Sequence, residues 1–202
     1  MIAHKAKASL AAALLTLAAL PAQAQDWTGA YVGASVSSHS GTSTDYLNSV
    51  LGTGYVNPDN RSGSMTSMHA GYRYQVENVV YGIELSRASG RLELEATPTN
   101  HIPGTTTALA KIGYAQDNFL FSLGVGYFSG KITPNCLAAC GETDISGLAL
   151  SVGADYAFEN GMTVGASVTK RNNRNDNHYP LLTGYEHKGA DTAVELRVGY
   201  NF

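Results

Sequence analysis

Residues 194–202 read VELRVGYNF, in which apolar side chains alternate with polar residues and one glycine. A period of two predicts a β-strand with two different faces, because successive side chains of a strand point to opposite sides. One face would carry Val194, Leu196, Val198, Tyr200 and Phe202, and the other Glu195, Arg197, Gly199 and Asn201. The last strand should therefore lie between an apolar and a polar environment.

The same alternation recurs along the chain. It predicts eight strands, at residues 27–38, 65–74, 79–88, 106–114, 119–130, 146–158, 162–170 and 191–202. Short connections (75–78, 115–118 and 159–161) alternate with long polar ones (39–64, 89–105, 131–145 and 171–190). The short turns would gather at one rim and the long loops at the other. This pattern predicts an all-β fold, an eight-stranded antiparallel up-and-down barrel.

Composition, charge and hydropathy argue against two other classes, nucleic-acid-binding proteins and helical membrane proteins. Charged residues make up only 14% of the 202 residues, against roughly 25% in soluble proteins. The formal net charge of -3 disfavours nucleic acid as a partner. After the first two dozen residues, no apolar run approaches the roughly 20 residues of a membrane-spanning helix, and the mean hydropathy of the whole chain is only -0.11.

The first 24 residues have the pattern of an export signal. A short basic start is followed by an apolar stretch and the small-residue triplet Ala22-Gln23-Ala24. These features predict a signal peptide over residues 1–24 and a barrel domain over 25–202. In an exported chain, the two cysteines Cys136 and Cys140 are expected to form a disulfide.

The decisive question for location is which strand face points outward. The polar faces hold most of the glycines and charges of both signs, which can pair in a narrow lumen; the predicted lumen network is His69, Arg73, Glu84, Lys111, Asp155, Glu195 and Arg197. Aromatic residues fall toward the short-turn ends of the strands, as in an interfacial girdle: Trp27, Tyr72, Tyr74, Tyr81, Tyr114, Phe119, Phe121, Tyr156, Phe158, Tyr200 and Phe202. Both patterns favour a transmembrane barrel over a secreted β-sandwich or a lipocalin-like carrier.

The two ends of the predicted barrel resemble a known family. Residues 26–33, DWTGAYVG, are similar to the opening of small surface-antigen barrels of the OmpA-like, opacity-porin group of Gram-negative outer-membrane proteins, and residues 194–202 resemble their last strand. The terminal Phe202 is similar to the signal read by the outer-membrane assembly machinery. The resemblance implies an integral outer-membrane protein that contacts outer-membrane lipids and that machinery, and that serves envelope integrity and surface recognition through host or surface ligands at its loops.

The lumen should be closed to general diffusion, because eight strands leave an interior that side chains can fill. Counting back from the first short turn places His69 opposite Glu84, in a pair that would hold two strands together. A narrow ion-conducting path through waters around Glu84 and Arg197 is the alternative function.

Neither a metal site nor an enzyme is expected. His39, His101, His178 and His187 lie in or beside the predicted long loops without the spacing of metal ligands, and no cofactor motif occurs. A barrel that deacylates lipid A would need a serine, a base and a carboxylate at its outer rim. The typical His-x-Ser-Asn pattern is absent, so catalysis of this kind is not predicted.

Overall fold

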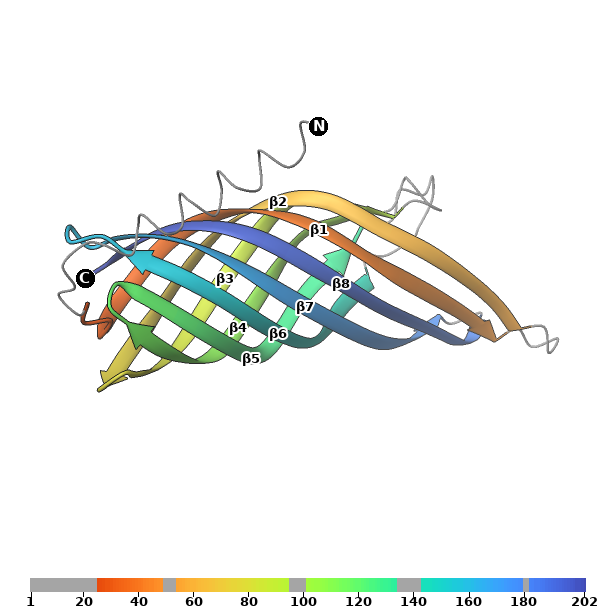
Figure 1. Ribbon diagram of the computed structural model, residues 1–202. Helices are drawn as coiled ribbons and strands as arrows, with labels where there is room; N and C mark the ends of the chain where they lie inside the picture. Colours follow the sequence, from red (N-terminus) through yellow and green to blue (C-terminus); the bar gives the residue numbers. More distant parts are fainter. Residues whose placement is uncertain (1–24, 49–53, 95–100, 134–142, 180–181) are drawn as a thin grey trace, which may run out of the picture.

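The computed structural model describes residues 25–48, 54–94, 101–133, 143–179 and 182–202, which form a closed barrel (Figure 1). Each strand pairs antiparallel with the next, and β1 pairs with β8 to close the sheet. The strands are β1 (Gly29–Asn48), β2 (Gly54–Val76), β3 (Val79–Leu94), β4 (His101–Gln116), β5 (Phe119–Ile132), β6 (Thr143–Ala157), β7 (Met162–Tyr179) and β8 (Leu182–Asn201). The predicted eight-stranded up-and-down barrel is confirmed. Within the described ranges, no helix is long and apolar enough to cross a membrane.

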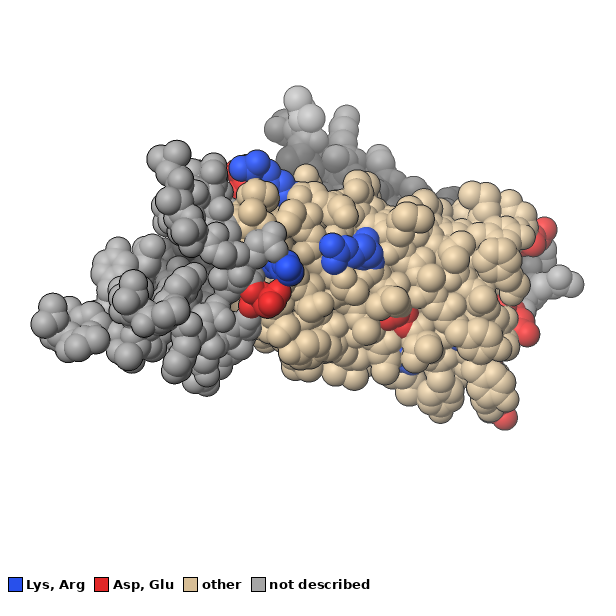
Figure 2. All heavy atoms as spheres, turned by 180° about the vertical axis from the view of Figure 1, so that it is seen from behind, with Lys and Arg blue, Asp and Glu red and all other residues tan. Residues whose placement is uncertain are grey.

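The apolar faces of the strands point outward. On β8, Leu196 is 63% exposed, whereas its neighbour Arg197 is buried at 7%. Figure 2 shows that uncharged residues cover most of the barrel wall on the side in view. Large apolar side chains that face outward on all eight strands need a lipid environment, because water would penalise each of them by roughly 1.5–3 kcal/mol relative to burial.

The strands run well beyond the predicted boundaries. The β1–β2 ladder continues to Asn48 opposite Gly54, and the β7–β8 ladder continues to Tyr179 opposite Leu182. The prediction of loops over 39–64 and 171–190 is therefore wrong for most of these residues. Apolar alternation marks only the part of a strand that faces lipid, whereas an antiparallel ladder can continue wherever backbone groups find partners.

The first short turn is tighter than the sequence suggested. Val76 pairs with Val79, so only Glu77 and Asn78 form the turn, and Glu77 has a φ of 54°. The register consequently shifts by two residues, and Glu84 lies opposite Gly71. The predicted pairing of His69 with Glu84 is wrong, since His69 lies opposite Ser86.

Candidate functional site in the barrel lumen

The centre of the lumen is organised around the carboxylate of Glu84 on β3. Arg197 Nη1 on β8 donates to Oε1 at 3.1 Å, and a second, shorter hydrogen bond joins Nη2 to Oε2. Lys111 Nζ on β4 and the Tyr31 hydroxyl on β1 donate to Oε2 at 3.2 and 2.8 Å. Four strands are thus joined through one carboxylate. Because Glu84 and Arg197 are both buried, neither charge is tolerable without the other.

Arg73 on β2 forms a second contact centre nearer the short-turn rim. Its guanidinium lies over the ring of Tyr31, with Cζ 3.9 Å from the centroid, and over the ring of Trp27 at 5.1 Å. Its two terminal nitrogens approach Asp155 Oδ2 at 3.5 Å and Asn201 Oδ1 at 3.4 Å. The planar cation therefore combines stacking with long polar contacts.

Trp27 does not belong to the interfacial girdle, which corrects the sequence prediction. Its side chain is 1% exposed and packs inside the short-turn rim, and its backbone N–H donates to Gln75 Oε1 at 2.9 Å. The apolar cluster at this rim is Trp27, Val80, Ala115, Leu120 and Ala157. The alternation along the strand indicated this inward position, since Trp27 is an even number of residues from Tyr31, which also faces inward. This cluster fills the short-turn end of the lumen.

A further buried cluster lies toward the opposite rim. Arg171 donates to Asp191 Oδ2 from Nε at 3.1 Å and from Nη2 at 2.6 Å, and its Nη1 donates to Thr105 Oγ1 at 2.8 Å. His39 Nδ1 lies 2.8 Å from Arg171 Nη2 and 3.2 Å from Asp191 Oδ2, and its Nε2 lies 2.9 Å from Ser37 Oγ. The sequence treated residues 39 and 171 as parts of loops, and so this cluster was missed.

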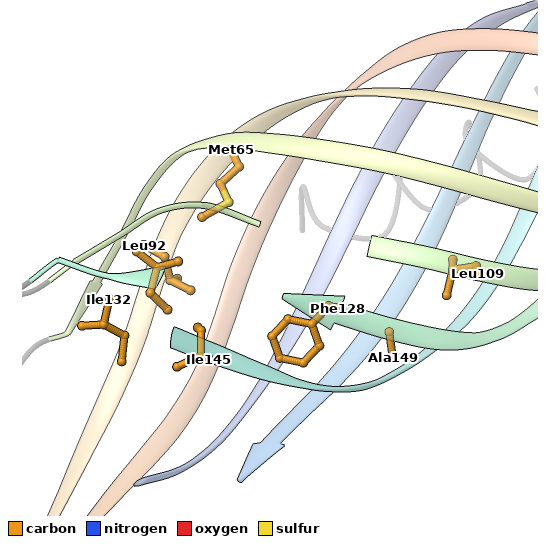
Figure 3. Close-up of a cluster of buried hydrophobic side chains, with 8 residues drawn as sticks. Met65, Leu92, Leu109, Phe128, Ile132, Ile145 and Ala149 are labelled. Atoms are coloured by element: carbon orange, nitrogen blue, oxygen red, sulfur yellow. The ribbon is translucent and has the colours of Figure 1, made fainter. Parts of the chain in front are cut away.

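An apolar plug fills the lumen next to the cluster of Arg171, Asp191 and His39. Figure 3 shows its side chains, which project inward from β2 to β6. The members are Met65, Leu92, Ile102, Leu109, Phe128, Ile132, Ile145 and Ala149. The guanidinium of Arg171 lies over the Phe128 ring, with Cζ 5.3 Å from the ring centroid. Most members lie in segments predicted as loops or glycine-rich lumen faces, which concealed the plug.

Two small cavities lie in the part of the lumen that the structure describes. One of about 40 Å³ is bounded by Glu84 and Arg197 on one side and by His39 and Arg171 on the other. Another of about 10 Å³ lies beside Tyr31, where Arg73 and Lys111 also contribute to its wall. These two cavities are therefore too small to hold more than a few waters each.

Comparison with known proteins identifies the family. The model of the family described as "Outer membrane protein beta-barrel domain" matches residues 9–202. The chain belongs to this outer-membrane β-barrel family. A comparison with curated proteins gives no match.

Solved structures share the fold of this outer-membrane β-barrel. OprG from Pseudomonas aeruginosa is 15% identical, with 90% of this chain and 99% of that chain covered and a TM-score of 0.59. Neisserial surface protein A is 14% identical, with 86% and 99% covered and a TM-score of 0.50. Identities this low show a common architecture only. The family places the protein in the outer membrane as an integral barrel.

The other predicted lumen residues lie in the barrel without equally strong contacts. His69 is buried, and its ring lies over Gly33, where any Cβ would collide with the imidazole. Within the described residues, His69 Nδ1 makes no hydrogen bond. Glu195 is half-buried and accepts a hydrogen bond from Ser167 Oγ at 3.4 Å.

The outer wall of the outer-membrane barrel carries the other aromatic residues of the predicted girdle. Those exposed on it are Tyr72, Tyr74, Tyr81, Tyr114, Phe121, Phe158, Tyr200 and Phe202. Phe119 and Tyr156 are half-buried and make an edge-to-face contact, with ring centroids 5.0 Å apart. The Phe202 ring contacts Tyr200 in a similar way at 5.1 Å, and its backbone N–H donates to the carbonyl of Ala30 at 2.9 Å.

Several predicted features lie outside the described residues. Cys136 and Cys140 are among them, as is the segment 1–24. Of the predicted loop histidines, His39 is instead a lumen residue and His101 begins β4. In the part of the chain that is described, no group of three or more His, Cys, Asp or Glu side chains is arranged to hold a metal ion.

Proposed function

We propose that this protein is a non-enzymatic surface protein that supports the envelope and contacts surface or host ligands through its extracellular hairpins. The observation that carries this proposal is a sheet that rises beyond the lipid-facing band on one side of the barrel. Leu47 on β1 still pairs with Tyr55 on β2 and with Tyr185 on β8. We call this region the outer sheet; it comprises residues 37–48 of β1, 54–66 of β2, 170–179 of β7 and 182–192 of β8.

The length of the outer sheet supports an exposed role. Among the β1 side chains that the structure describes, Val36 is the last large apolar one that faces outward, and the strand continues to Asn48. At about 3.3 Å per residue, this continuation measures about 40 Å along the strand. The longest strands, β1, β2 and β8, all belong to it (Figure 1).

The composition of the outer sheet suits recognition. Tyr46, Tyr55, Tyr179 and Tyr185 occur among Ser, Thr, Asn and Gly residues. The backbone register places Tyr55 and Tyr185 opposite the same residue of β1, on its two neighbouring strands. Tyrosine is enriched at protein interfaces because it buries a large ring and keeps a polar hydroxyl.

The proposal is tested by shortening the outer sheet. Residues 44–58 are removed, and Ser43 and Asp59, which are paired in the native hairpin, are joined by an Asn-Gly turn. Adherence of expressing bacteria to cultured epithelial cells should fall to that of bacteria without the protein. Heat-dependent gel mobility controls for folding, and survival in detergent with a chelator reports the envelope role. Unchanged adherence by a folded truncated barrel would contradict surface recognition through this sheet.

A narrow ion-conducting path is a second candidate, favoured by the position of the water-sized cavities. They lie on both sides of the Glu84 centre, about 40 Å³ beside Arg171 and about 10 Å³ beside Tyr31. Opening of the Glu84–Arg197 pair would begin to connect them. Planar-bilayer recordings of wild type and of Glu84→Gln distinguish the roles, with Glu159→Gln as the control because Glu159 is exposed in the third short turn. Steps that change only in Glu84→Gln would support conduction, and silent membranes for all three would reject it.

A further inference from the structure

We infer that a groove on the lipid-facing wall binds one molecule of lipopolysaccharide, with an acyl chain along β1 and a phosphate at Arg87. This inference concerns the lipid-facing wall and shares with the proposed function only the orientation of the barrel, in which the short turns face the periplasm. Its basis is two adjoining hollows of about 640 and 580 Å³ on the outer wall. Both are lined by Ala34, Met68, Arg87 and Val198, so they form one continuous groove.

The groove arises from side-chain size. Ala34 on β1 lies opposite Met68 on β2 and opposite Val198 on β8. The larger neighbours stand on both sides of a small floor residue, and Met68 is 75% exposed. Because the thioether side chain is flexible and polarizable, Met68 can adapt to an acyl chain in the groove. A hydrocarbon chain would bury this apolar surface without the loss of any hydrogen bond.

Arg87 supplies the charge that selects the head group. The outward residues of β3 are Tyr81, Ile83 and Leu85, followed by Arg87 and Ser89, so the guanidinium marks the outer boundary of the apolar band. Arg87 Nη1 donates to Thr106 Oγ1 at 2.7 Å, which orients the group. Among the ion pairs formed by described residues, none includes Arg87.

An unpaired guanidinium at this level favours a phosphate partner. Arginine presents several donors in a planar arrangement that matches phosphate oxygens. In this orientation, with the short turns facing the periplasm, Arg87, which lies toward the end of β3 away from the short turn, is level with the head groups of the outer leaflet. Lipopolysaccharide is the outer-leaflet lipid that combines phosphate groups with several acyl chains. It therefore matches both the charge and the groove.

The test measures lipid retention by native mass spectrometry of the full chain, folded in detergent. The protein is offered deep-rough lipopolysaccharide, phosphatidylglycerol or phosphatidylethanolamine in separate samples. The variants are Arg87→Gln, which removes the charge, and Ala34→Phe, which fills the groove. Arg91→Gln is the matched control, because Arg91 lies on the same strand, is exposed and already pairs with Glu93 at 3.0 Å.

Wild type and Arg91→Gln should each retain one lipopolysaccharide molecule. Arg87→Gln should weaken that retention by roughly tenfold or more, the loss expected for a charge-assisted hydrogen bond. Ala34→Phe should lower retention of all three lipids. Equal lipopolysaccharide retention by Arg87→Gln and wild type would overturn the inference. So would a preference for phosphatidylglycerol, or a lipid-free dimer that occupies the groove. Heat-dependent gel mobility controls for folding, and if Ala34→Phe fails to fold, Arg87→Gln decides alone.

Discussion

Glu84 on β3 and Arg197 on β8 are separated by 113 residues in the chain, and their side chains meet in the lumen through two hydrogen bonds. Lys111 and Tyr31 donate to the same carboxylate. The lumen wall is therefore joined across the barrel as well as around it. Such a central link explains how a barrel with many glycines on its inner face keeps a defined cross-section.

Glu84→Gln should destabilise the barrel by about 3–5 kcal/mol, because it leaves Arg197 and Lys111 buried without a compensating charge. Urea unfolding in lipid vesicles, followed by gel mobility, measures the loss. Glu195→Gln is the control: Glu195 is half-buried and has one long hydrogen bond, at 3.4 Å to Ser167. It should cost less than about 1 kcal/mol. Equal losses in the two variants would contradict the central role of Glu84.

Asp191→Asn should loosen the outer half of the barrel and leave the periplasmic half intact. Asp191 is the carboxylate partner of Arg171, with Nη2 at 2.6 Å, and its neutralisation leaves a buried guanidinium poorly paired. We expect faster amide hydrogen exchange at residues 39–42 of β1 and unchanged exchange near Tyr31. Asp155→Asn is the comparison, since Asp155 approaches Arg73 only at 3.5 Å. Uniform exchange along β1 would argue against a local role for Asp191.

Trp27, the single tryptophan of the chain, makes its own position measurable. Because its side chain is 1% exposed inside the rim, brominated acyl chains should quench its fluorescence weakly. The matched variant carries Trp27→Phe together with Tyr200→Trp, which moves the indole to the lipid-facing wall, and quenching there should be strong. Strong quenching of wild type would instead place Trp27 in the interfacial girdle. Trp27→Ala should lower the free energy of unfolding by about 3–5 kcal/mol, since it leaves a cavity in the rim cluster.

The first turn offers a test of backbone conformation. Glu77 has a φ of 54°, in a left-handed region that favours Gly and, among L-residues, Asn and Asp. Glu77→Gly should raise stability by about 0.5 kcal/mol, because relief of the left-handed conformation, worth roughly 1–2 kcal/mol, exceeds the added chain entropy. Glu77→Val should lower stability. Glu159→Gly in the third turn is the control, since φ is not positive at Glu159, and it should destabilise.

The sequence alone determined the number of strands, their faces and the location of the protein. Val198 faces lipid and Arg197 faces the lumen because a strand alternates its side chains with a period of two, and this rule is local. The same rule also predicts that Trp27 faces inward, but the girdle prediction placed it outside because it is aromatic. It could not reveal where strands end beyond the membrane, because a backbone ladder continues without apolar alternation.

Only the closed tertiary structure decided which lumen residues meet. Glu84 faces Arg197 rather than His69 because a two-residue turn sets the register of β2 and β3, and closure of β1 on β8 sets the stagger around the barrel. His39 and Arg171 come together for the same reason, although 132 residues separate them. Contacts across the lumen depend on the registers of all the strand pairs between the two residues. The sequence of a single strand cannot predict these combined registers.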